Sequence, residues 1–92
     1  MSTSSWEDAR KSYLTSLRAR LKKAYALEAE PDSTPDKRWL NGFMAAGFHS
    51  GLVTLKELKL ENMTAYRKVC GETMSNAKED RLQQRLMKLS AS

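Results

Sequence analysis

The chain has 92 residues, of which 40 % are hydrophobic and 29 % charged, and its 16 Lys and Arg outnumber its 11 Asp and Glu. This composition excludes an intrinsically disordered chain, and the length leaves room for one domain only. A domain of this size buries roughly 60–65 % of its surface, so its core is thin. We therefore expect a single domain over residues 6–89, with disordered ends at 1–5 and 90–92.

A single cysteine, Cys70, leaves no internal disulfide to form and indicates a reducing compartment. The first residues, MSTSSWEDARK, hold no apolar run and so do not read as a secretory signal. The longest apolar stretch, residues 42–48, is far shorter than the ~20 residues that span a bilayer. The sequence thus predicts a soluble, cytoplasmic protein without a membrane partner.

The first predicted helix begins near Ser5, where Ser5 and Asp8 form a capping pair, and it ends at Pro31. Its length of about 24 residues corresponds to roughly 36 Å, which is long for this domain. Apolar residues recur on it at three- and four-residue spacing and form one stripe. The stripe consists of Trp6, Tyr13, Leu14, Leu17, Leu21, Ala24 and Tyr25.

Arg10 lies within that apolar stripe. Either its stem packs while its head reaches solvent, or its guanidinium meets a carboxylate of another helix or another chain. A narrow stripe with charged flanks is also typical of a helix that pairs with a second copy of itself. An antiparallel dimer would bring Arg10 of one copy to Glu28 of the other. The candidate interface of that dimer is Trp6, Tyr13, Leu17, Leu21 and Tyr25.

A second helix is predicted over residues 35–50, with Thr34 as its cap and Pro35 in its first position. Its apolar face consists of Trp39, Leu40, Phe43, Met44, Gly47 and Phe48. Small residues at 42 and 45–47 favour close approach of a neighbouring helix, because glycine otherwise costs about 1 kcal/mol in a helix. We expect this helix to be the central and most buried element.

Ser50 and Gly51 form a hinge, and Thr54 with Glu57 forms a capping box at the start of a third helix that ends at Gly71. Asn62 interrupts its apolar face, so a kink or break near Asn62 stays open. A last helix starts at Ser75 or Asn76, with Glu79 reaching back to the cap, and ends near Leu89. Its thin apolar stripe consists of Leu82, Leu86 and Leu89. The predicted fold is therefore all-α, a small bundle of three or four helices with a long amphipathic first helix.

Residues able to carry out catalysis are few. His49 and Cys70 lie on different helices with no orienting partner or oxyanion pocket marked by a motif. Cys70 on an apolar stripe is typical of a small buried hydrophobe, and His49 at a helix end is typical of a cap for free carbonyls. No cluster has metal-ligand spacing, and no phosphate loop is present. We expect no enzyme activity, cofactor, metal or small-molecule substrate.

Basic residues are concentrated in the first helix, with six between Arg10 and Lys23 and no acidic residue among them. Such a cluster indicates an acidic partner or is simply a solvated face. The candidate basic surface is Lys11, Arg18 and Lys22 on one flank, with Arg20 and Lys23 on the opposite flank. No aromatic residue lies among these cations on the helix's exposed side, where it could stack on bases.

Residues 51–71 resemble a helix-turn-helix only if the third helix breaks at Glu61-Asn62. The second half would then present Tyr66, Arg67 and Lys68 as candidate recognition residues. A continuous helix is the favoured interpretation, because no glycine marks the break.

Two functions stay open. The favoured hypothesis is a non-enzymatic regulatory protein that acts through protein–protein contacts, as a homodimer through the first helix. The alternative is a basic helical nucleic-acid-binding protein. The two differ in whether Lys11, Arg18 and Lys22 are exposed on an open face.

Overall fold

The computed structural model describes residues 4–26 and 35–91, and in this part of the chain all regular structure is helical. Four helices follow one another: α1 (Ser4–Ala26), α2 (Pro35–His49), α3 (Leu55–Cys70) and α4 (Asn76–Ala91). The prediction of a small all-α bundle with a long first helix is confirmed. Pro35 opens α2 as expected, whereas Glu28, Pro31 and Thr34 lie outside the described residues.

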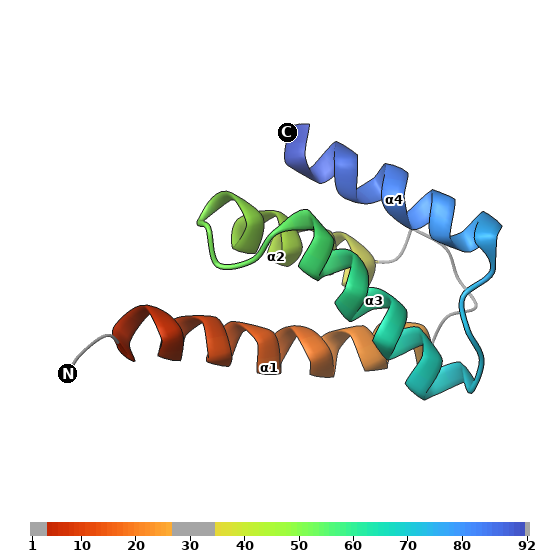
Figure 1. Ribbon diagram of the computed structural model, residues 1–92, viewed down its shortest axis with the longest axis horizontal. Helices are drawn as coiled ribbons and strands as arrows, with labels where there is room; N and C mark the ends of the chain where they lie inside the picture. The colour runs from red at the N-terminus through yellow and green to blue at the C-terminus, as the bar shows by residue number, and fades with distance from the viewer. Residues whose placement is uncertain (1–3, 27–34, 92) are drawn as a thin grey trace.

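The four helices form a closed ring of neighbours rather than following chain order. α1 packs against α3 and α2, and α4 packs against the same two helices from the other side. Figure 1 shows α1 at the bottom and α4 at the top, with α2 and α3 between them. The most extensive contact is the one between α1 and α3. α2 therefore has the inner position that the sequence predicts, but it shares this position with α3, which makes the most extensive contact (Figure 1).

The core is made of apolar side chains from all four helices and from the connections before α3 and α4. Leu17 and Leu21 of α1, Met44 of α2, Leu58 of α3 and Leu86 of α4 are almost fully buried. Met74, in the connection before α4, is also buried, and nothing in its local sequence marks it as a core residue. Leu82 is buried too, so the apolar stripe of α4 closes this bundle itself and needs no second chain.

The start of α3 is the capping box predicted from the sequence. The Thr54 hydroxyl accepts a hydrogen bond from the Glu57 amide at 3.1 Å, and the Thr54 amide donates to the Glu57 carboxylate at 2.9 Å. These two bonds satisfy backbone donors that the first helical turn leaves free. Val53 and Leu58, the residues of the predicted hydrophobic staple, are both buried.

The predicted hinge between α2 and α3 is also confirmed. Gly51 has a φ of 83°, in the left-handed region that glycine adopts without steric cost. The amides of Leu52 and Val53 both donate to the carbonyl of Gly47 in the last turn of α2. These two bonds turn the chain away from the helix axis after His49. At the other end of α3, Gly71 takes the same left-handed conformation, with a φ of 76°.

Asn62 lies in the core without breaking α3, so the kink considered at this position is absent. Its amide group donates to the Leu58 carbonyl one turn earlier, at 2.8 Å, and its carbonyl oxygen accepts from the Tyr25 hydroxyl at 2.9 Å. The side chain is 1 % exposed, and burial without such partners would be costly. Asn62 therefore joins α1 to α3 by a satisfied buried polar contact.

The two glycines of α2 have different roles. A Cβ at Gly47 would overlap the ring of Tyr13, whereas a Cβ at Gly42 would meet nothing within 4 Å. Gly47 thus permits the close approach expected of it, but the approaching group is a side chain of α1 rather than a helix backbone. Gly42 is exposed and has no such neighbour.

Several smaller expectations are wrong. Trp39 is 49 % exposed although its ring stacks on Phe43, while Phe43 and Phe48 are partly buried. Cys70 is exposed, since the last turn of α3 carries it off the buried face. The start of α1 at Ser4 and the end of α4 at Ala91 lie within two residues of the predicted bounds.

The Glu79 carboxylate does not return to the start of α4 but pairs with Lys59 of α3 at 3.1 Å. Within the described residues, no helix is both long and apolar enough to cross a membrane.

Candidate functional site

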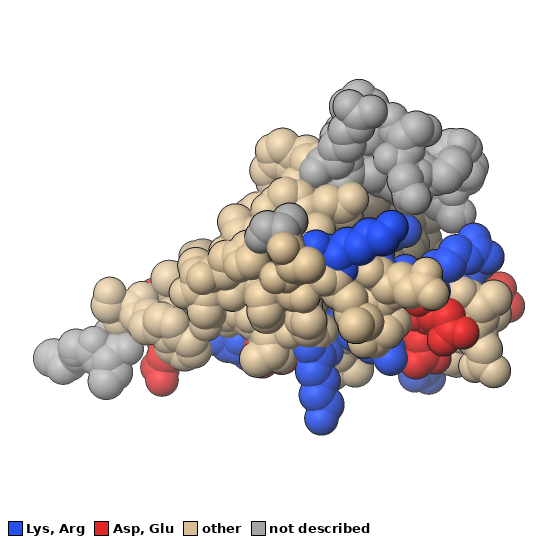
Figure 2. Space-filling model, turned by 90° about the horizontal axis from the view of Figure 1, so that it is seen from above, with Lys and Arg blue, Asp and Glu red and all other residues tan. Residues whose placement is uncertain are grey.

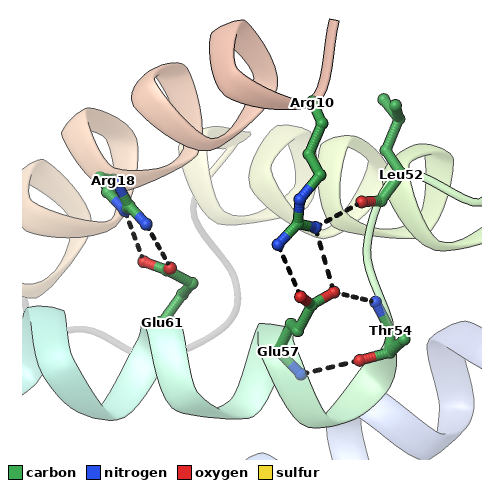
Figure 3. A network of polar contacts seen from close by, with 6 residues as sticks. All are labelled: Arg10, Arg18, Leu52, Thr54, Glu57 and Glu61. Carbon is green, nitrogen blue, oxygen red and sulfur yellow. Dashed lines mark hydrogen bonds and ion pairs between the residues drawn. The ribbon is translucent and has the colours of Figure 1, made fainter. Parts of the chain in front are cut away.

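The seam between α1 and α3 neutralises charge within the chain. Arg10 reaches across it to Glu57 with two hydrogen bonds of 2.7 and 3.2 Å, and it also donates to the Leu52 carbonyl at 2.8 Å. Figure 3 shows this network together with the capping box at Thr54, which shares the same Glu57 carboxylate. The prediction that Arg10 meets a carboxylate of another helix is confirmed, and its guanidinium is therefore already engaged.

Glu57 is the acidic partner in this network. The Arg10 guanidinium, followed by the Thr54 amide, holds the pKa of the Glu57 carboxyl below its ordinary value. The carboxylate form is favoured because both neighbours donate hydrogen bonds to it. Glu57 therefore fixes the start of α3 and the position of α1 at once.

Arg18 makes the second ion pair of this seam. Its guanidinium donates to both carboxylate oxygens of Glu61, at 2.8 and 2.9 Å, as Figure 3 shows. A bidentate Arg–carboxylate pair is geometrically specific, although its energetic value at an exposed site is small. Arg18 is thus a poor member of the candidate basic surface, since its charge is matched within the chain.

The other members of that surface lack such partners. Lys11, Lys22 and Lys23 are exposed, and none forms an ion pair with a described residue. Lys22 lies one turn beyond Arg18 on the same flank, and Lys11 lies two turns before it. Two arginines of α1 are therefore used to hold the fold, while its lysines point into solvent.

The seam between α1 and α2 is different in kind. Tyr13 stacks on Phe43 with ring centroids 4.5 Å apart, and Phe43 stacks on Trp39 at 5.1 Å. The Arg20 guanidinium lies over the outer face of Trp39, with its central carbon 3.9 Å from the ring centroid. Four planar groups thus form one ladder that runs from the buried Tyr13 to the exposed Arg20.

Tyr13 fixes the buried end of the ladder. Its hydroxyl donates to the Phe43 carbonyl at 2.8 Å, beside Gly47, and burial raises the pKa of Tyr13 to about 12. The hydroxyl therefore stays protonated and keeps donating over the whole physiological pH range. Only the far end of the ladder, at Trp39 and Arg20, is open to solvent.

Arg20 belongs to an exposed row on the flank of α1 that faces α2. At about 100° per residue, positions spaced by three and four share one flank of a helix. Every member of this row is exposed, and none is acidic. We call it the α2-side row; it consists of Ser5, Ala9, Ser12, Ser16, Arg20 and Lys23.

The candidate dimer interface is largely used by the chain's own core. Tyr13 is 8 % exposed, and Leu17 and Leu21 are fully buried, so their apolar surface is covered without a second copy. Tyr25 is partly buried, with its ring against Tyr66. Trp6 differs, because α1 extends past the α2–α3 turn and leaves it 53 % exposed (Figure 1).

The favoured interpretation of this stretch is confirmed, since α3 is one continuous helix from Leu55 to Cys70, and the helix-turn-helix alternative, which required a break at Glu61-Asn62, does not hold. Tyr66 is buried, with Lys78 of α4 donating to its hydroxyl at 3.3 Å, so it cannot enter a groove. Arg67 and Lys68 are exposed at the end of the helix. They add positive charge to the surface but do not form a recognition helix.

The single histidine contacts a carbonyl, but that of another helix. His49 Nε2 lies 3.2 Å from the Leu89 carbonyl in the last turn of α4. Among the residues described here, no group of three His, Cys, Asp or Glu side chains is placed to hold a metal ion. His49 ends α2 and Cys70 ends α3, and neither lies in the α1–α2 seam.

The face on the α4 side differs from α1 in how its charged side chains are distributed. Figure 2 shows this face, where blue side chains lie across the middle and toward one end, next to red ones at that end, with uncharged residues over most of the rest. Among the four helices, α1 has the largest excess of basic residues, with six Lys and Arg against Glu7 and Asp8. The residue that sequence reasoning missed there is Trp39, because only the packing of α2 against α1 places its ring under Arg20.

No family model matches the chain, and no curated protein or solved structure matches it either. The function has to be argued from the α1 surface itself.

Proposed function

We propose that this protein is a non-enzymatic nucleic-acid-binding protein that uses the exposed cations of α1. The observation that carries the proposal is how the chain distributes its own carboxylates. Glu57 and Glu61 pair with Arg10 and Arg18, and no described carboxylate pairs with Lys11, Arg20, Lys22 or Lys23. α1 therefore presents cations that form no ion pair with a described carboxylate, which favours a partner that is itself anionic.

The positions of these cations suit a phosphate backbone. Lys11 and Lys22 lie eleven residues apart, which is about 16 Å along a helix. Arg20 and Lys23 extend the positive charge to the other flank. A rigid helix with cations on two flanks contacts several phosphates without reading bases, so we expect binding that tolerates different sequences. The net charge of +5 on the whole chain also favours binding to a polyanion.

The proposal is tested by measuring the affinity for a fluorescently labelled oligonucleotide over a range of salt concentrations. We expect clear binding at low salt and a steep linear decrease of log K with log salt, because bound cations release counter-ions. Changing Lys11, Lys22 and Lys23 together to Gln should make the slope shallower by about 2 to 3.

A matched control changes Lys56, Arg81 and Lys88 to Gln, which removes the same net charge from exposed positions of α3 and α4. This variant should keep most of the affinity. Equal losses in the two variants would mean that only net charge matters, and absence of binding by the wild-type protein at low salt would end the proposal.

A protein–protein contact is a second candidate function, and Trp6 favours it. Exposed tryptophan is typical of the centre of interfaces, and Trp6 lies on the overhanging first turns of α1 at 53 % exposure. The test is sedimentation of the wild type against Trp6→Ala. A dimer that dissociates in the variant would support self-association, whereas Leu17→Glu would unfold the core and answer nothing.

The location proposed for this activity is the cytoplasm. Cys70 is a free thiol on the surface, and an exposed thiol is most stable in a reducing compartment.

A further inference from the structure

We propose that Trp39 is a stacking site for an unpaired nucleobase, so that the protein prefers single-stranded to double-stranded nucleic acid. This inference rests on the proposed nucleic-acid function and names its ligand more narrowly. Its basis is the ladder of Tyr13, Phe43, Trp39 and Arg20 in the α1–α2 seam.

The ladder already has the geometry of stacked bases. The planes of Trp39 and Phe43 differ by 13°, and those of Phe43 and Tyr13 differ by 16°. Because the Tyr13 hydroxyl is anchored to the Phe43 carbonyl, the inner rings are held in place and Trp39 rests on a fixed support. The one outer face of Trp39 is covered by a guanidinium, which is held by a cation–π contact and by no ion pair with a described residue.

A base can take the position of that guanidinium. Arg20 is on an exposed stretch of α1, so its side chain has solvent to move into. A base stacked on Trp39 would displace the guanidinium from the ring, and the guanidinium would then pair with an adjacent phosphate. Stacking on aromatic rings together with cations along the backbone is the usual means of binding single strands.

The charge around Trp39 selects an anionic occupant. The α2-side row supplies Arg20 and Lys23 as cations and Ser12 and Ser16 as hydroxyl donors, and no member of the row carries a carboxylate. A peptide docking on Trp39 would have no need of this combination, whereas a phosphodiester backbone uses all of it.

The outer surface of α2 next to Trp39 leaves room for such a strand. Gly42 and Ala46 are exposed and lie three and seven residues beyond Trp39, on the same side of the helix. A Cβ at Gly42 would meet no atom within 4 Å, so the surface is open there. This gives the exposed glycine, which no helix contact explains, a role beside the stacking site.

The experiment uses the Trp6→Phe protein, in which Trp39 is the single tryptophan. It is titrated with an oligothymidylate and with an abasic phosphodiester of the same length and charge. We expect the oligothymidylate to quench Trp39 fluorescence and to bind about tenfold more tightly than the abasic chain. Trp39→Leu should bring the oligothymidylate affinity down to that of the abasic chain, while Trp39→Phe should restore part of the difference.

The outcomes separate the two proposals. If neither chain binds, the proposed function fails. If both chains bind with equal affinity and Trp39 fluorescence does not change, the function stands and the stacking site is wrong. A duplex that quenches Trp39 as strongly as the single strand would also overturn the preference for unpaired bases. Circular dichroism of each variant shows whether it is folded. Arg20→Gln removes the guanidinium but leaves the three stacked rings of Tyr13, Phe43 and Trp39 in place, so it should keep the Trp39 quenching by oligothymidylate and weaken its binding. Loss of the quenching in this variant would contradict the stacking site.

Discussion

α1 has two seams, and they are built from different chemistry. Toward α3 it is held by ion pairs and a buried amide, through Arg10, Arg18 and Tyr25. Toward α2 it is held by stacked rings, and there its Arg20 has an aromatic face in place of a carboxylate. The first seam satisfies its own charges and closes the fold. The second leaves a cation and a tryptophan open to solvent, and this is why the candidate site lies on the α2 side.

The largest effect is expected from Gly47→Ala, which disrupts the α1–α2 seam. The new methyl group would overlap the Tyr13 ring and displace the hydroxyl from the Phe43 carbonyl. Overpacking of this kind costs about 1–3 kcal/mol, so the free energy of unfolding should fall by that amount in urea denaturation. A variant as stable as the wild type would mean that the seam yields easily and that the ladder has no rigid inner support.

The control for that variant is Gly42→Ala, which lies five residues before Gly47 in the same helix and is open to solvent. Because nothing opposes a Cβ at Gly42, the substitution should stabilise the protein by about 0.5–1 kcal/mol. The two variants thus make the same Gly→Ala change in the same helix, and the expected changes in the free energy of unfolding have opposite signs.

A comparison of Arg10→Ala with Arg20→Ala sharpens the contrast between the seams. Arg10 is partly buried and bonded to Glu57 and Leu52, so its loss should lower the free energy of unfolding by about 1 kcal/mol. Arg20→Ala should change stability by less than about 0.5 kcal/mol, because Arg20 is exposed and has one cation–π contact.

The two variants should rank in the opposite order when nucleic-acid affinity is measured instead of stability. Arg20→Ala should weaken oligonucleotide binding, and Arg10→Ala should leave it nearly unchanged under conditions where the variant is folded. Losses of affinity that follow the losses of stability in both variants would contradict the division of roles between the seams.

The smallest effect concerns the acid sensitivity of the α1–α3 seam. The pKa of Glu57 is lower in the folded chain than its ordinary value in the unfolded one, so the unfolded chain binds the proton more readily. The contribution of Glu57 to stability is therefore present above its ordinary pKa and is lost as the pH falls through the lowered folded value. Melting temperatures of the wild type and Glu57→Gln at neutral pH and near pH 3 should converge at the acid end. A constant difference between the two proteins would show that the charge of Glu57 does not matter.

Local signals in the sequence were sufficient to predict where the helices begin and end. The Thr54–Glu57 capping box, the hinge at Gly51 and the end of α3 at Gly71 all involve residues within six positions of one another, so the chain specifies them without its tertiary structure. The apolar stripe of α1 likewise identified Leu17 and Leu21 as buried. It did not identify what covers them, because a stripe looks the same whether its partner is the chain's own α3 or a second copy.

Which side chains meet across the seams was decided only by packing. Arg10 and Glu57 lie 47 residues apart in the chain, and Arg20 and Trp39 belong to helices whose mutual rotation no local pattern encodes. Sequence alone determined that this chain is helical and which faces of its helices are apolar, because those properties depend on residue spacing. The tertiary structure decided that Arg10 and Arg18 of α1 pair with carboxylates of α3, whereas Arg20 lies on Trp39 of α2 and pairs with no described carboxylate. Ion pairs and ring stacks of this kind form only where two helices are placed against each other.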